Sequence, residues 1–66
     1  MEQREVLKRQ LDKLTQEHRE LDQMIERMMN EHVVNQIAVM RLKKRKLLIK
    51  DQIIRVRAQM LPDILA

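Results

Sequence analysis

The sequence contains no cysteine, glycine, serine or aromatic residue, and its single proline is Pro62. Without cysteine the chain forms neither a disulfide nor a thiolate metal site. Without aromatic side chains it lacks the platforms on which single-stranded nucleic acids usually stack. The absence of glycine excludes the glycine-rich loops that bind nucleotide phosphates.

Long apolar runs are also missing. The longest are only a few residues, whereas a membrane-spanning helix needs about 20. A helix lying on a membrane surface usually carries tryptophan or phenylalanine. The first ten residues, MEQREVLKRQ, are charged throughout and lack the apolar core of a signal peptide. We therefore expect a soluble, cytoplasmic protein that does not bind membranes.

The composition is typical of amphipathic helices. Charged residues make up 36% of the 66 residues and apolar residues 44%, a balance found in coiled coils. A chain this short is near the lower limit for burying its own core, so it usually needs a staple or a partner. Because disulfides are excluded, we expect one domain, residues 1–66, stabilised by association with other helices.

Apolar residues recur at alternating spacings of three and four in two segments, which predicts an all-α protein. In the first segment the positions are Leu7, Leu11, Leu14, His18, Leu21, Ile25, Met28 and His32, with histidine at two of them. In the second they are Val39, Leu42, Lys46, Ile49, Ile53, Val56 and Met60, with Lys46 the polar exception. Pro62 ends the second helix and leaves a short tail, 62–66. The predicted helices cover about 3–29 and 36–60.

The segment between the helices allows two architectures. Asn30 is suited to close the first helix and Asn35 to cap the second, which favours a turn near 30–35. However, the heptad phase continues through this segment, so one continuous coiled-coil helix is the alternative. Residues 1–32 carry a net charge of −2 and residues 33–66 a net charge of +6, which favours an antiparallel hairpin. An antiparallel dimer of long helices satisfies the same charges.

A fold-back centred at residues 32 and 33 predicts which side chains meet. It places Leu11 against Ile54, His18 against Leu47 and Ile25 against Met40. It also places Asp22 beside Lys43 as a structural ion pair.

The second helix carries another apolar stripe, spaced by seven residues. Its members are Met40, Leu47, Ile54 and Leu61. A helix that is apolar on two faces normally contacts two neighbours. We expect this stripe to be the self-association interface through which hairpins form a helical bundle.

The segment RLKKRKLLIKDQI, residues 41–53, concentrates positive charge. The basic side chains concerned are Lys43, Lys44, Arg45, Lys46 and Lys50. On a helical wheel they do not share one face, and long lysine side chains commonly flank a helical interface. We therefore interpret them first as a solvated flank that faces acidic side chains of the first helix. A surface for anions or nucleic acids is the alternative.

Other candidate sites are weak. His18 and His32 are about 21 Å apart along one helix, too far to share a metal ion, so we interpret them as half-buried structural residues rather than pH sensors. The methionines near the turn, Met24, Met28, Met29 and Met40, are expected to fill the core there, with an adaptable surface for binding partners as the alternative. Nucleophiles are limited to Thr15 and the lysines, which predicts a protein that is not an enzyme and has no cofactor.

Two segments together carry a family resemblance. EHRELDQMI at 17–25 and RLKKRKLLIKDQI at 41–53 resemble the paired segments of the YdcH-like family of small bacterial proteins. The resemblance implies a cytoplasmic helical hairpin with no established activity. Family members often place Gly, Pro, Ser or Asp in the connector, whereas this chain has NEHVVN.

The function predicted from these features is that of a small self-associating helical interaction or adaptor protein. The partners expected are a second copy of the chain and an unidentified protein. A small basic nucleic-acid-binding protein is the alternative.

Overall fold

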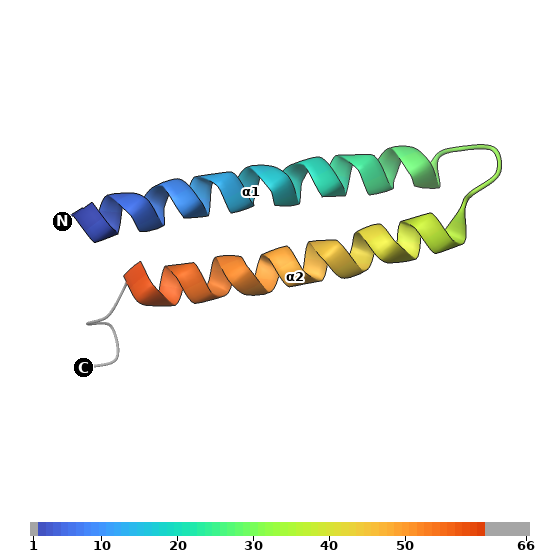
Figure 1. Cartoon of the computed structure of the whole chain (residues 1–66). Coiled ribbons are helices and arrows are strands. Elements are labelled where there is room, and N and C mark those ends of the chain that lie inside the picture. The colour runs from blue at the N-terminus through green and yellow to red at the C-terminus, as the bar shows by residue number, and fades with distance from the viewer. Residues whose placement is uncertain (1, 61–66) are drawn as a thin grey trace.

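The computed structural model describes residues 2–60, which form two helices. Helix α1 spans Glu2–Met29 and helix α2 spans Gln36–Met60. The chain reverses in the six residues between them, and the helices lie side by side and antiparallel (Figure 1). The predicted hairpin, with helices at 3–29 and 36–60, is therefore confirmed, and the continuous helix is not formed.

The start of α2 is set by Asn35. Its side-chain Oδ1 accepts a hydrogen bond of 3.1 Å from the backbone N–H of Ala38, and its carbonyl accepts one of 3.0 Å from Val39. This is the arrangement of an N-cap, which satisfies a backbone donor that the first turn of a helix leaves without a partner. The predicted cap at Asn35 is confirmed.

The end of α1 is closed through the backbone. The N–H of Asn30 lies 3.2 Å from the carbonyl oxygens of both Glu26 and Arg27. No residue in the described part of the chain has a positive φ angle. Because glycine is needed mainly where φ is positive, this connector forms without one. That accounts for a connector, NEHVVN, that contains neither glycine nor proline.

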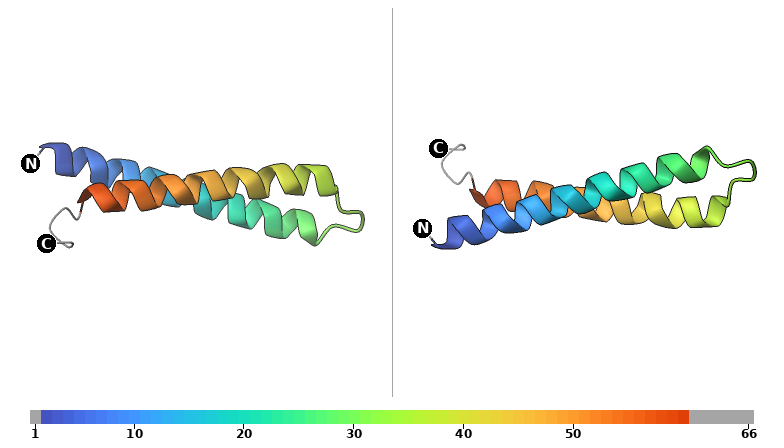
Figure 2. Two further views of the ribbon diagram at one scale, coloured as in Figure 1. Left: turned by 90° about the horizontal axis from the view of Figure 1, so that it is seen from below. Right: turned by 90° about the horizontal axis from the view of Figure 1, so that it is seen from above.

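The core lies along the line where the two helices meet. One cluster of its buried members consists of Leu7, Leu14, Leu21, Ile49 and Val56, and partly buried Leu11, Leu42, Ile53 and Met60 pack against it. Ile25 and Val39 are also buried. The α2 positions spaced by three and four from Val39 to Met60, with Lys46 among them, are called the inner stripe below. Figure 2 shows the helices crossing at a shallow angle, as expected when stripes of this spacing pack together.

The hairpin is only two helices thick, and its thinness determines which helix faces remain exposed to solvent. Its Cα atoms extend over 50 × 20 × 13 Å. Each helix therefore has one neighbour, and any apolar side chain turned away from that neighbour faces solvent. Helix α1 concentrates its apolar residues on one face, whereas α2 has apolar residues on two.

Candidate interaction surface on the second helix

The outer stripe is a row of apolar side chains on α2 that the hairpin leaves uncovered. We use this name for Met40, Leu47 and Ile54, together with Ile37, which lies one turn before Met40. Their exposed fractions are 68% for Met40, 67% for Leu47, 56% for Ile54 and 67% for Ile37. Leu61, the fourth residue predicted for this interface, lies outside the described residues.

Helical geometry explains why these side chains miss the core. Met40, Leu47 and Ile54 each follow an inner-stripe position by one residue, which rotates them about 100° away from it. The predicted contacts of Leu11 with Ile54, His18 with Leu47 and Ile25 with Met40 are therefore wrong, because all three outer-stripe side chains are exposed. Ile53, the neighbour of Ile54, packs against the core instead.

An ion pair joins the two helices beside the core. Lys46 Nζ donates a hydrogen bond of 2.6 Å to Asp22 Oδ1. This hydrogen bond, and next the positive charge of Lys46, lower the pKa of Asp22 below its usual value, and the nearby His18 acts in the same direction. Asp22 remains largely exposed, so the pair is a surface interaction that orients the helices rather than a buried one.

The predicted partner of Asp22 was Lys43, and the structure corrects it to Lys46. Lys46 occupies the inner stripe and is partly buried against α1, whereas Lys43 is exposed. Three positions separate these lysines, which turns Lys43 about 60° away from the line facing α1. The sequence already indicated that Lys46 faces α1, because Lys46 is the one polar residue at the inner-stripe positions.

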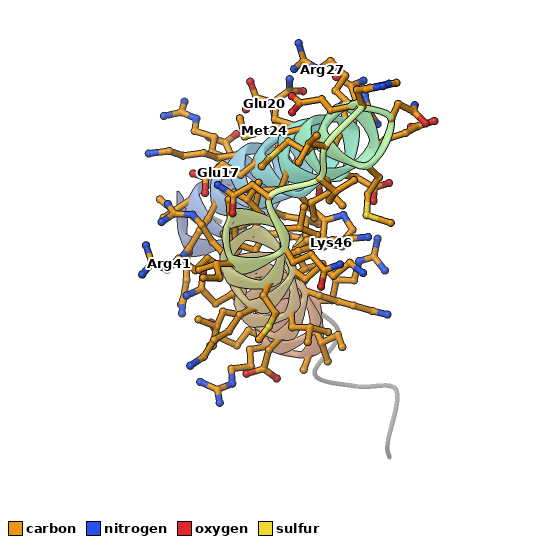
Figure 3. All side chains as sticks on the ribbon, turned by 90° about the vertical axis from the view of Figure 1, so that its right-hand side faces the viewer. Glu17, Glu20, Met24, Arg27, Arg41 and Lys46 are labelled. Carbon is orange, nitrogen blue, oxygen red and sulfur yellow. The ribbon has the colours of Figure 1, made fainter. Side chains whose placement is uncertain are left out.

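The remaining basic residues of the segment face solvent. Lys43, Lys44, Arg45 and Lys50 are all exposed. Figure 3, which looks along the hairpin from the connector end, shows Lys46 on one side of the molecule and Arg41 on the other, on the same side as Glu17. Positive charge therefore surrounds α2 instead of forming a single basic face.

The two histidines have different surroundings. His18 is partly buried in α1, as predicted, and its Nε2 atom is buried with no hydrogen-bond partner in the described part of the chain. His32 is exposed in the connector, so its predicted half-buried position is wrong. The reason is that α1 ends at Met29, and residue 32 no longer lies on the helical stripe.

The methionines at the connector end are more exposed than predicted. The exposed fractions are 42% for Met24, 50% for Met29 and 68% for Met40, while Met28 is partly buried. The expectation that they fill the core is wrong for the first three. Met29 and Met40 instead border an open hollow of about 340 Å³, which Val34, Gln36, Val39 and Lys43 complete. The outer stripe thus continues into an apolar depression at this end.

Groups suited to chemistry are few in residues 2–60. The hydroxyl of Thr15 donates a hydrogen bond of 2.8 Å to the carbonyl of Leu11, within its own helix. His, Asp and Glu side chains do not gather there in a group of three that could hold a metal ion. Neither α1 nor α2 has an apolar stretch long enough to cross a membrane.

These features define a helical-hairpin protein with one packed interface and one open apolar stripe. The sequence profile of a family described as "Protein of unknown function (DUF465)" matches residues 11–57. Because the match covers most of the chain, the protein belongs to this family of small YdcH-like helical proteins, and the resemblance seen in the sequence is confirmed. Comparison with curated proteins and with solved structures gives no match.

Proposed function

We propose that this protein is a small interaction protein that acts through helix packing and not through catalysis. Two hairpins associate through their outer stripes, and the resulting bundle presents its charged faces to an adaptor partner. The observation that carries the proposal is the exposure of Met40, Leu47 and Ile54 along one line of α2. A bacterial, cytoplasmic setting, which the family resemblance implies, belongs to the same proposal.

Two physical arguments support self-association. Several exposed apolar side chains aligned on one face of a small protein usually mark an interaction site, because leaving them in water is unfavourable. A two-helix chain of 66 residues also buries little apolar surface by itself. A second hairpin laid on the outer stripe covers the patch and enlarges the core in one step.

The mass in solution tests the proposal directly. Sedimentation equilibrium of the parent protein should give at least twice the chain mass of 8.1 kDa. Replacing Leu47 and Ile54 together by Gln should lower both mass and helicity, because polar side chains remove the apolar contact. Val6→Gln is the control: Val6 is an apolar side chain of similar exposure, 59%, but it lies on α1 and outside the outer stripe. A monomeric parent protein, or an equal effect of the control, would contradict the proposal.

A second candidate function is binding of nucleic acid. What favours it is that Lys43, Lys44, Arg45 and Lys50 all face solvent, leaving their charges accessible to phosphates. Replacing Lys43, Lys44 and Arg45 together by Gln should then abolish binding to duplex DNA or RNA while the unfolding midpoint stays almost constant. We expect binding weaker than about 10 μM at physiological salt, the level of non-specific attraction. Submicromolar, salt-sensitive binding would favour this second function over the first.

A further inference from the structure

Charged residues lie on the same face of α2 between the apolar members of the outer stripe, and they have a regular order. Following the stripe at spacings of three and four gives Ile37, Met40, Lys44, Leu47, Asp51, Ile54 and Ala58. The order is close to symmetric about Leu47: Met40 and Ile54 lie seven residues to either side, and Lys44 and Asp51 lie just inside them. Lys44 and Asp51 are both exposed. They carry opposite charges and lie three residues before and four residues after Leu47, at nearly the same distance from the centre of the stripe.

This order distinguishes the two ways in which a second copy can lie on the stripe. In a parallel contact each residue meets its own equivalent, so Lys44 faces the partner's Lys44 and Asp51 faces the partner's Asp51. In an antiparallel contact with its twofold axis at Leu47, Lys44 comes within one residue, about 1.5 Å along the helix, of the level of the partner's Asp51. The long lysine side chain spans that offset, and symmetry repeats the pair. Charged residues at such positions set the orientation of packed helices, because like charges oppose one arrangement.

We infer that a second copy of this chain docks antiparallel on the outer stripe, with Lys44 of each protomer paired to Asp51 of the other. The inference rests on the proposed self-association and adds its orientation and its polar contacts. The two Leu47 side chains meet at the axis, and Met40 packs near the partner's Ile54. The connectors of the two hairpins then lie at opposite ends of the bundle.

The local contacts of Asp51 leave room for such a pair. Arg55 Nη2 lies 3.1 Å from Asp51 Oδ2, one helical turn along α2. The other carboxylate oxygen, Oδ1, has no ion-pair partner in residues 2–60, and neither has the ammonium group of Lys44. A carboxylate accepts hydrogen bonds at both oxygens, so Asp51 can keep Arg55 and still accept a bond from the partner's Lys44.

Charge reversal tests the pairing. Lys44→Glu should raise the dimer dissociation constant about tenfold, because two exposed attractions become two repulsions. Adding Asp51→Lys in the same chain should restore most of the affinity. Arg45→Glu makes the same change in net charge about 100° away and should have little effect. In a parallel dimer Lys44→Glu replaces one repulsion by another, so an unchanged dissociation constant would overturn the inference.

A distance measurement tests the orientation independently of charge. The chain has no cysteine, so Gln59→Cys gives one spin label per protomer at an exposed site outside the stripe. Gln59 lies twelve residues beyond Leu47, so an antiparallel dimer separates the two labels by about 35 Å. A dimeric mass with labels closer than about 20 Å, as neighbouring parallel helices require, would overturn the orientation and leave self-association standing. A monomeric mass of the parent protein would instead overturn the proposed function itself.

Discussion

Ile49 and Ile54 offer a matched test of which surfaces of α2 are buried in solution. They are the same residue type in the same helix, yet Ile49 is 5% exposed and Ile54 is 56% exposed. Replacing either by alanine raises helix propensity by the same amount, less than about 0.7 kcal/mol. This contribution cancels when the two variants are compared. The difference between their free energies of unfolding therefore reports only what surrounds each side chain.

The magnitude for Ile49 follows from its burial in the core. Removing a buried isoleucine side chain down to alanine costs about 2–5 kcal/mol. We expect the lower part of that range, about 2–3 kcal/mol, because a core between two helices is open at its flanks and can partly close the gap. A domain of this length has a total stability of roughly 3–10 kcal/mol, so the change is a large share of it.

The magnitude for Ile54 depends on whether the outer stripe is covered. In a lone hairpin the substitution should change the free energy of unfolding by less than about 0.5 kcal/mol, as at an ordinary surface position. In a self-associated bundle it removes buried apolar surface and should cost about 1–2 kcal/mol, at about 25 cal/mol per Å². Because association obeys mass action, this cost should grow with protein concentration.

Urea unfolding followed by circular dichroism at two protein concentrations measures both effects. The expected result is a loss for Ile49→Ala at both concentrations and a larger loss for Ile54→Ala at the higher one. If Ile54→Ala has no effect at either concentration, the outer stripe is not an interface between copies. If Ile49→Ala has no effect, the packing of the hairpin itself is refuted.

Two further predictions concern polar contacts. Asn35→Ala should lower the free energy of unfolding by about 1 kcal/mol, because it removes the N-cap of α2. Asn30→Ala keeps the backbone contacts at the end of α1 and should change the free energy by less than about 0.5 kcal/mol, as thermal unfolding can measure. Lys46→Glu should destabilise the hairpin modestly and Asp22→Lys should restore part of the loss, whereas Lys43→Glu should show no coupling to position 22 in the same double-mutant cycle. Because the folded-state pKa of Asp22 is lowered, the ionised carboxylate should contribute fully to the free energy of unfolding above about pH 4. This contribution should be lost as the pH falls through the folded-state pKa, and Asp22→Asn should remove that part of the acid sensitivity.

The sequence by itself determined the features that depend on neighbours along the chain. The spacing from Leu7 to Met28 and from Val39 to Met60 places apolar side chains on one face of each helix, because a helix repeats every 3.6 residues. Asn35 caps α2 through a contact only three residues away. The paired segments at 17–25 and 41–53 were also enough to indicate the family.

Only the tertiary structure decided which side chains meet across the hairpin. Two stripes on α2 were both apolar, and the packing against α1 buries the one containing Ile49 while leaving Leu47 in solvent. The same choice pairs Asp22 with Lys46 instead of Lys43. Shifting α2 by one turn along α1, or rotating it by about 60° about its own axis, changes which side chains meet. The helical pattern of the sequence is the same in either case. Register and rotation depend on how the side chains of both helices pack together and on the path of the connector, and these exist only once the chain has folded back.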